Sequence, residues 1–553
     1  MKYFISLLLL FVFGSSTAQL NDALIQDIYY QRYETAKQEL ASQIQQGNAA
    51  PDAYYWLTEL HLKEKDLVSA ANILQSGMSH FNLSNPPSKD FPMLSSAWAQ
   101  LLLDSGKTTE ARAIMEKLLD GTKYKDTKSL IAVARANIES KNGDLSWAIT
   151  LLEKAVKKDK KNPTIYSLLG DASRKLGDGS NAIQYYSAAL EADPHFAEAM
   201  YKKGMLYKAQ NNTEVYVERF HSAYAIDSMY VPAIYQLYEY YFGKDNALAG
   251  KMLSAYIRHA DPSPEHAYMT ADLQFISKAY PEAIQTAKQI LEHTTTVKPR
   301  LYKLLAYSLA ETNDSAESLK YMQHYFATAD TGTVIARDYT FMANLSKSQG
   351  LEKSVEIGWL EKALSLETDA TERLTQMQTL ADLEKENGNR LKEADWREKI
   401  YTAKYEPGNL DIYKWGMALY AAEKYGQADS VFGIYASKYP DQIYGYLWQA
   451  RCSALLDSNM EKGLAIPHYK NLVQIASKDS IKNKSTLLSA YGYLGSYEAN
   501  TTRNFPESLY YFNKILELEP ENKDALKYKN ILEVWIAKSQ GSDTDAPGNQ
   551  PGK

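Results

Sequence analysis

The chain has almost no cysteine. Cys452 is the only one among 553 residues, so no disulfide can form within the chain, even in an oxidising compartment. No cysteine stands near the N-terminus, which excludes a lipid anchor on an N-terminal cysteine. Cys452 falls in a predicted helix, residues 444–456, where a cysteine commonly behaves as a small buried hydrophobe rather than as a nucleophile. We therefore expect an inert, buried thiol.

An excess of one charge is also missing. The 61 basic and 67 acidic residues give a formal net charge of −6. The basic cluster at residues 157–161 lies at the end of a predicted helix, where cations suit the helix dipole. A nucleic-acid-binding protein would carry a basic stripe that follows the phosphates. We therefore expect no nucleic-acid partner.

Catalytic and cofactor motifs are scarce. Residues 105–108 read Ser-Gly-Lys-Thr, but Leu101 stands where a phosphate-binding loop needs its first glycine. His259 and His266 are the closest histidine pair, and no His-Glu-x-x-His motif is present. A Gly-x-Ser-x-Gly element is absent as well. We therefore expect no enzymatic activity, no cofactor and no metal site.

The one marked apolar stretch lies at the N-terminus. Residues 4–13 are apolar, about ten residues and too short to cross a bilayer core of roughly 30 Å as a helix. Lys2 precedes this stretch, and the small residues 16–18 follow it, which is the pattern of a secretory signal peptide. We predict a signal peptide over residues 1–18, a mature chain from Gln19 without a transmembrane segment, and a periplasmic location in which association with the outer membrane stays open.

The chain does contain a signature that returns every 34 residues. Gly170 is followed 34 residues later by Gly204, and Ala189 is followed by Ala223; Ala155 stands 34 residues before Ala189. A fixed period of this length is typical of repeat proteins, in which each repeat is one supersecondary unit. The signature therefore predicts a stack of similar units.

This spacing resembles the tetratricopeptide repeat, a helical hairpin with a small residue at place 8 and an aromatic residue at place 24. The resemblance implies an all-α, superhelical α-solenoid of about twelve hairpins, because one hairpin alone leaves a face unburied. We expect an N-terminal array over residues 21–260 and a C-terminal array over residues 264–538. A capping helix with a polar outer face, residues 522–538, would end the second array, and residues 541–553 would form a disordered tail.

The aromatic content is high, with 43 tyrosines and 8 tryptophans. In tetratricopeptide proteins the concave groove is lined by first-helix places 2, 5, 6, 9, 12 and 13. Tyrosine and tryptophan there offer rigid contact area with a polar tip, whereas elsewhere they fill the seams between helices. The resemblance implies a partner-binding groove lined by Tyr55, Trp56, Tyr201, Tyr235, Tyr307, Tyr413, Tyr420, Trp448 and Arg451.

These features together predict a non-enzymatic scaffold for protein–protein interactions in the bacterial cell envelope. Its partner would be another envelope protein, which places a peptide or a helix in the concave groove. The alternative is a carbohydrate-binding protein, because aromatic rings also stack on sugars. A clamp for a C-terminal carboxylate is rejected, since its matching places hold only Lys303 and Asn137 in isolation. The partner, its pathway and the oligomeric state stay open.

Overall fold

The structure, a computed structural model, describes residues 22–47, 49–83 and 90–541. The predicted signal peptide, residues 1–18, lies outside these ranges. So do residues 542–553 of the predicted tail. Both therefore stay predictions.

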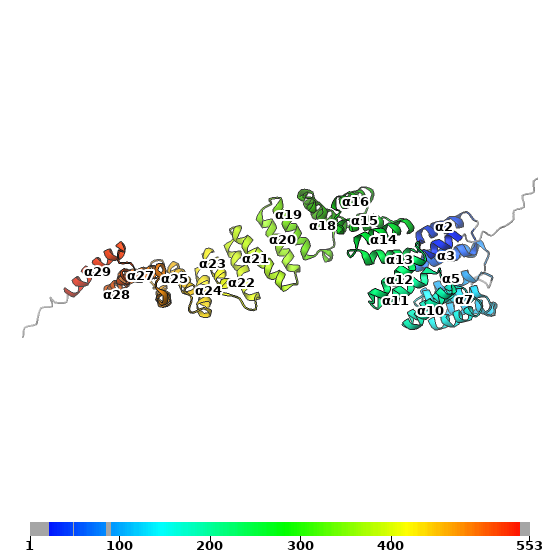
Figure 1. Ribbon diagram of the computed structural model, residues 1–553, viewed down its shortest axis with the longest axis horizontal. Coiled ribbons are helices and arrows are strands. Elements are labelled where there is room, and N and C mark those ends of the chain that lie inside the picture. The colour runs from blue at the N-terminus through cyan, green and yellow to red at the C-terminus, as the bar shows by residue number, and fades with distance from the viewer. Residues whose placement is uncertain (1–21, 48, 84–89, 542–553) are drawn as a thin grey trace, which may run out of the picture. The chain divides into compact units, whose positions relative to one another are not determined.

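Every regular element among the described residues is helical, with 29 α-helices and no strand, which confirms the all-α solenoid (Figure 1). The first unit contains α1 (Asp22–Tyr29), α2 (Tyr33–Gln45), α3 (Pro51–Lys63), α4 (Leu67–His80), α5 (Pro92–Asp104), α6 (Thr108–Gly121), α7 (Thr127–Glu139), α8 (Leu145–Val156), α9 (Pro163–Lys175), α10 (Gly179–Ala192), α11 (Ala197–Ala209), α12 (Thr213–Ile226), α13 (Val231–Tyr241), α14 (Asn246–His259), α15 (Glu265–Ile276), α16 (Tyr280–His293) and α17 (Arg300–Glu311). The second unit contains α18 (Ser315–Thr328), η1 (Thr331–Thr333), α19 (Ala336–Ser348), α20 (Lys353–Leu366), α21 (Ala370–Glu386), α22 (Arg390–Ala403), α23 (Asn409–Ala421), α24 (Tyr425–Lys438), α25 (Ile443–Leu456), α26 (Ile466–Ala476), η2 (Ser477–Asp479), α27 (Lys484–Tyr497), η3 (Glu498–Thr502), α28 (Phe505–Leu518) and α29 (Lys523–Gly541).

The first compact unit ends at Thr312 and the second begins at Asn313. Sequence analysis places its division between the two arrays at residues 260–264 instead. The compact units do not divide there because α14 and α15, on either side of that Pro-rich joint, pack against each other.

Paired in chain order, helices α1 to α28 form fourteen hairpins among the described residues, more than the expected twelve. The hairpin α13–α14 matches the repeat signature weakly, because Tyr238 stands at place 8, where the signature has a small residue.

In several hairpins the turn is encoded by a left-handed residue followed by an Asp or Asn cap. Gly177 has a φ of 82°, and Asp178 then caps α10 by accepting a hydrogen bond from the backbone N–H of Asn181 at 3.0 Å. Asn211 and Asn212 repeat this arrangement before α12. The first helices α3, α5 and α9 begin at proline, whose fixed φ suits a first turn that needs no N–H group. Local sequence therefore defines where these helices start.

The two helices of a hairpin touch where a glycine on the first faces an aromatic ring on the second. A Cβ atom added to Gly170 would lie 2.3 Å from the ring of Tyr186, closer than any such contact allows. Tyr186 is fully buried at this point. The same contact recurs in other hairpins, at 2.6 Å for Gly204 and Phe220, at 2.6 Å for Gly416 and Phe432, and at 3.0 Å for Gly495 and Phe512. This confirms the roles expected for places 8 and 24.

The N-terminal hairpin α1–α2 closes the first unit on itself. Asp261, in the joint before α15, accepts hydrogen bonds from the backbone N–H groups of Glu34 at 2.9 Å and Thr35 at 3.0 Å, and from the Thr35 hydroxyl at 2.6 Å. These N–H groups belong to the first turn of α2, where Arg32 at the N-cap provides no side-chain acceptor. Asp261 therefore caps a helix 227 residues earlier in the chain.

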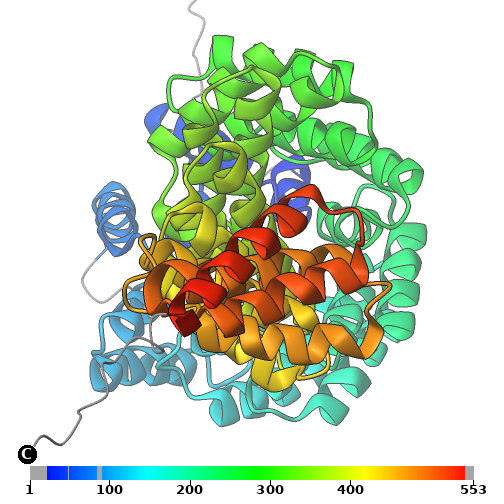
Figure 2. The same cartoon turned by 90° about the vertical axis from the view of Figure 1, so that its left-hand side faces the viewer.

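Aromatic contacts complete this closure. The ring of Tyr29, at the end of α1, lies 5.7 Å from that of Phe196 and 5.2 Å from that of Tyr230. Its hydroxyl accepts a hydrogen bond from the backbone N–H of Glu198 at 3.3 Å. Figure 2 shows the cyan-to-green helices of this unit following one another along a curve. The contacts of Tyr29 connect later parts of this unit to the first hairpin.

The last helix and the cysteine lie where the sequence places them. α29 packs on α28 through the ring pairs Phe512–Tyr528 and Phe505–Trp535, each 5.1 Å apart. Its exposed surface is not wholly polar as expected, because Leu526 and Val534 stay 42% and 52% exposed. Cys452 is fully buried, and burial raises the pKa of its thiol to about 12. The prediction of a buried thiol is confirmed.

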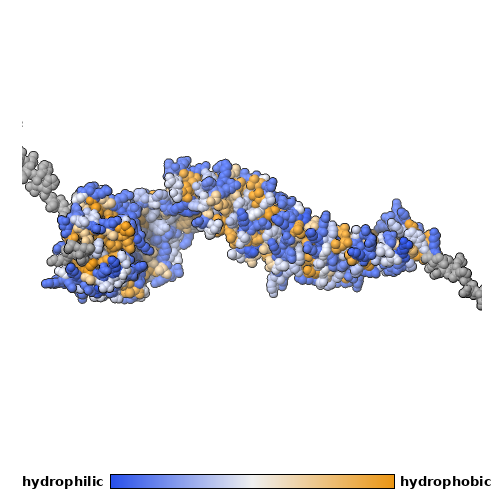
Figure 3. Space-filling model, turned by 180° about the vertical axis from the view of Figure 1, so that it is seen from behind, coloured by the Kyte–Doolittle hydropathy of each residue, from blue (hydrophilic) through white to orange (hydrophobic). Residues whose placement is uncertain are grey.

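Among the described residues, no helix is both long and apolar enough to cross a bilayer. On the face in Figure 3, hydrophobic residues are scattered among hydrophilic ones. This agrees with the balanced charge composition.

Gly170→Ala should destabilise the protein by about 1 to 3 kcal/mol, because the added methyl group overpacks the contact with Tyr186. Gly250→Ala is the matched control in the same unit. Its Cβ would lie 3.8 Å from Leu273, so the better helix propensity of alanine should stabilise by up to about 1 kcal/mol. Melting temperatures of both variants measure this. An increase in both would show that the hairpin contact is not tight.

Asp261→Ala should loosen the closure of the first unit by about 0.5 to 2 kcal/mol, because two first-turn N–H groups of α2 lose their acceptor. Hydrogen exchange followed by mass spectrometry should show faster exchange in the peptide that covers Glu34 and Thr35. Asp261→Asn keeps an oxygen acceptor and should exchange close to the wild-type rate. Equal exchange in the alanine variant and the wild type would contradict the cap.

Candidate functional site

The first unit encloses a cavity of about 760 Å³, which we call the inner cavity. Its walls are the first helices α3, α5, α7, α9 and α11, and α1 together with the turn before α2 covers it. On α9 the lining residues stand at places 2, 5, 6, 9, 12 and 13 counted from Pro163. The groove positions expected from the repeat are therefore correct for this helix.

The lining of the inner cavity is rich in charge. Seven basic and five acidic side chains line it, although the whole chain carries a formal net charge of −6. The basic residues are Lys63, Lys65, Arg135, Lys141, Arg174, Lys175 and Lys202, and the acidic residues are Glu59, Asp104, Glu139, Asp171 and Glu198. The cavity is thus locally cationic within an acidic protein.

One part of this lining is internally paired. Lys202 pairs with Glu198 at 2.5 Å and with Asp171 at 2.6 Å, and it donates to the Ser167 hydroxyl at 2.9 Å. Burial acts to raise the pKa of Glu198, but the pair with Lys202 holds it below its usual value. Tyr186 donates its hydroxyl to Asp171 at 2.8 Å. These groups satisfy one another and form a structural network.

Arg135 is not neutralised in this way. Its guanidinium lies 5.1 Å from the centre of the Trp56 ring, and no carboxylate among the described residues reaches the 4.0 Å of an ion pair with it. The nearby Glu59 has its pKa raised to about 8, first by burial and further by Glu139 and Asp104, while Arg135 opposes the shift. A side-chain amide atom of Gln100 lies 3.3 Å from each Glu59 oxygen. A cation and a largely protonated carboxyl group therefore face the same space.

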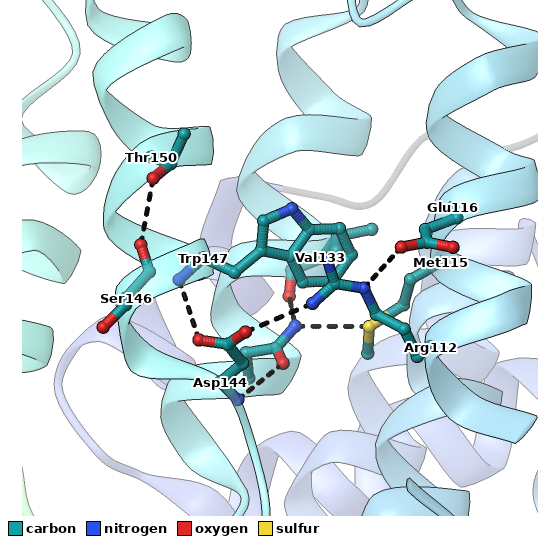
Figure 4. A network of polar contacts seen from close by, with 9 residues as sticks. Arg112, Met115, Glu116, Val133, Asp144, Ser146, Trp147 and Thr150 are labelled. Atoms are coloured by element: carbon teal, nitrogen blue, oxygen red, sulfur yellow. Dashed lines mark hydrogen bonds and ion pairs between the residues drawn. The ribbon is translucent and has the colours of Figure 1, made fainter. Parts of the chain in front are cut away.

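Arg112, on α6, shows the contrasting arrangement (Figure 4). Its guanidinium lies 3.5 Å from the centre of the Trp147 ring, but it also pairs with Glu116 at 2.7 Å and with Asp144 at 3.2 Å. The neighbouring Asn137 donates to the Val133 carbonyl at 2.9 Å and accepts from the Asp144 N–H at 2.9 Å. Asn137 therefore has a structural role, in agreement with the rejected carboxylate clamp.

A second pocket, of about 620 Å³, lies on the other side of the turn between α1 and α2. Gln31, in this turn, lines both the inner cavity and the second pocket. Tyr235, Tyr238 and Tyr256 form its aromatic wall, with Tyr235 and Tyr256 5.2 Å apart. Burial, then Glu239, raises the pKa of Tyr235 to about 12. The acidic side chains that line the second pocket already have partners; Glu239, for example, pairs with Lys208 at 3.2 Å.

The five predicted groove residues of the first unit are dispersed. Trp56 lines the inner cavity and Tyr235 lines the second pocket. Tyr55 is only 2% exposed and belongs to the core, Tyr201 packs between Phe220 and Tyr230, and Tyr307 lies 6.5 Å from Phe275. In this unit most of the chosen aromatic residues pack between helices, and Tyr55 presents almost no surface to a partner.

The four predicted residues of the second unit form one cluster, which we call the aromatic cluster. The ring of Trp448 lies 5.0 Å from Tyr420 and 6.4 Å from Tyr413, and the Arg451 guanidinium lies 4.7 Å from its centre. α23 and α25, the first helices of consecutive hairpins, carry these side chains. Arg451 is exposed, and the neighbouring Tyr444 is 50% exposed.

Sequence reasoning missed the charged residues of the inner cavity, although the signal was available. Glu59 and Asp171 stand at place 9 of α3 and α9, and Arg174 and Lys175 stand at places 12 and 13 of α9. Except for Arg451, the predicted groove residues are all aromatic. Reading every residue type at the same places would have found the cavity lining.

Comparison with known families agrees with this geometry. Residues 133–197 and 168–214 match the tetratricopeptide repeat family, and they cover α9, α10 and the contact between Gly170 and Tyr186. This chain is a tetratricopeptide repeat protein. Its repeats make it a scaffold for protein–protein interactions. No curated protein matches its sequence.

Several solved structures resemble this tetratricopeptide repeat protein in part. The C-terminal part of a repeat-containing protein from Cytophaga hutchinsonii is 25% identical, covers 47% of this chain and 98% of its own, and has a TM-score of 0.29. A tetratricopeptide repeat protein from Parabacteroides merdae is 18% identical, with coverages of 46% and 98% and a TM-score of 0.29. The complex of Naa15 and Naa10 with HypK is 12% identical, with coverages of 95% and 94% and a TM-score of 0.26. Likenesses at such TM-scores carry no argument about function.

Glu59 should make the protein less stable as the pH rises from about 5 to 8. Its raised pKa means that the folded state keeps a proton which the unfolded state, with a pKa of 4.5, releases in this range. Glu59→Gln should therefore raise the melting temperature relative to the wild type more at pH 8 than at pH 5. Glu191→Gln, an exposed control, should show no such pH dependence. A constant difference between Glu59→Gln and the wild type would contradict the buried, protonated carboxyl group.

Proposed function

We propose that this protein is a non-enzymatic scaffold of the bacterial cell envelope, which binds a peptide or a helix of another envelope protein along the first helices of its second unit. The single observation that supports this most is the aromatic cluster. It gathers four of the predicted groove residues from two successive first helices, on a repeat frame that serves protein binding.

The composition of the aromatic cluster suits a protein partner. Tyrosine, tryptophan and arginine dominate the energetics of protein interfaces because they bury much area and keep polar tips. Arg451 is exposed and is positioned over Trp448, so a partner can meet a charged and an aromatic group at one point. Tyr444, 6.1 Å from Tyr413, extends the cluster toward solvent.

A sugar-binding role for the aromatic cluster is less well supported. A sugar needs the open face of an aromatic ring on which to stack. The Trp448 ring is stacked on Phe432 at 5.8 Å with an interplanar angle of 21°, and Arg451 lies over it as well. The ring is therefore already engaged with protein groups.

Site-specific photocrosslinking tests the proposal. p-Benzoylphenylalanine at position 444, beside the aromatic cluster, should form a covalent adduct with a single protein in the envelope fraction of the source organism, identified by mass spectrometry. The same probe at Ile434, which is 36% exposed on the second helix α24, is the matched control and should form no such adduct. Arg451→Ala should lower the yield at position 444 about tenfold, the effect of losing an interface hot spot.

The location is read from the same experiment by fractionation. The mature protein should appear in the periplasmic or outer-membrane fraction. Equal crosslinking at positions 444 and 434, or no adduct at either, would contradict the proposed binding surface, and recovery in the cytoplasm would contradict the envelope location.

A further inference from the structure

We propose that the inner cavity of the first unit is a binding site for a small organic anion, a carboxylate or a phosphate with an apolar body, and that Arg135 is its main ligand. This site is separate from the aromatic cluster of the second unit. It would add small-molecule binding to the scaffold.

The size and the cover of the cavity favour a small molecule. Its volume of about 760 Å³ falls within the roughly 300 to 1,000 Å³ typical of small-molecule sites. α1 covers the space with Ile25, Ile28 and Tyr29, and the contacts of Tyr29 and Asp261 hold the N-terminal hairpin in place. The hairpin thus occupies the path that an extended polypeptide would follow through the groove.

The charge of the cavity favours an anion. Lys202 pairs with both Glu198 and Asp171, and the other six basic lining residues lack a carboxylate within ion-pair distance among the described residues. Lys175 donates instead to the backbone carbonyl of Ile138, and Lys63 donates to the Tyr33 hydroxyl at 2.7 Å. These partners are neutral, so the positive charge is not cancelled.

Arg135 is the group in which this imbalance is sharpest. A guanidinium offers five N–H donors in a planar fork that matches a carboxylate or a phosphate. Arg135 is half-buried, and taking a charge partly out of water without a partner is costly. Arg112 shows that the same fold supplies carboxylates to an arginine stacked on tryptophan when the role is structural. Arg135 likewise lies over a tryptophan, Trp56, but it forms no ion pair with a carboxylate of the described residues.

The remaining lining suits the body of such a ligand. Trp56 lies beneath Arg135, and Leu60, Leu168 and Phe196 also line the cavity. Glu59, when protonated, is a further hydrogen-bond donor to the anion. An amphipathic organic anion would therefore find a cation, a donor and apolar walls in one enclosed space.

Calorimetry and thermal shift on the mature chain test this with four probes of one shape: phenylacetate, phenyl phosphate, the neutral 2-phenylacetamide and the cationic phenethylamine. The two anions should bind at one site per chain and raise the melting temperature, and the stronger of them identifies the preferred charged group. The amide and the amine should bind at least tenfold more weakly than the anions.

Variants assign the site. Arg135→Gln should weaken anion binding at least tenfold. Arg135→Lys keeps the charge but loses the planar fork of donors, so its affinity for the anions should lie between those of the wild type and Arg135→Gln. Arg112→Gln is the matched control, an arginine over tryptophan outside the cavity, and should bind like the wild type. Without ligand, Arg135→Gln should melt no lower than the wild type, which shows that the variant folds and that the guanidinium is not a structural tie.

Three results would overturn the proposal. They are no binding of either anion at millimolar concentration, equal binding of the amide, and unchanged binding in Arg135→Gln. None of them bears on the crosslinking at position 444, so this site and the protein-binding surface can fail separately.

Discussion

The contact between a glycine of one helix and an aromatic ring of the next is the constraint on which the rest of the structure depends. At Gly170 and Gly204 even one extra carbon would collide with the rings of Tyr186 and Phe220, so the helices of each hairpin lie as close as their backbones permit. This approach sets how one hairpin stacks on the next. In the first unit the first helices line a common interior, and α1 covers the space that they enclose.

Because α1 covers this interior, charged side chains inside it are less exposed to water. Inside such a space ionic interactions are stronger than in water, and an uncompensated charge is costlier. The Lys202 network meets this condition by pairing. Arg135 does not, although the fold shows at Arg112 that pairing is available to an arginine stacked on tryptophan. The difference separates a charge that stabilises the fold from one that is held ready for a ligand.

The two units use one repeat for different surfaces. In the first, the groove places carry charge and face a covered cavity. In the second, the corresponding places of α23 and α25 carry Tyr413, Tyr420, Trp448 and Arg451, which gather into one cluster. A frame that depends only on its small and aromatic packing residues leaves the other first-helix places free to vary, so a single chain can hold a small-molecule site and a protein-binding surface.

The sequence by itself determined the helical repeat, the hairpin turns at Gly177 and Asn211, the buried Cys452 and the groove places, because spacing and local capping act over a few residues. It could not show that Tyr55 is buried while Trp56 faces a cavity, since adjacent residues differ only in which neighbour they meet. Only the tertiary structure decided the cap that Asp261 places on α2, 227 residues away, and the lack of an ion pair at Arg135. Both features depend on the curvature of the stacked hairpins, which brings later helices of the first unit back to its first hairpin. That curvature is the sum of small angles between many successive hairpins, and the sequence of a single repeat does not specify it.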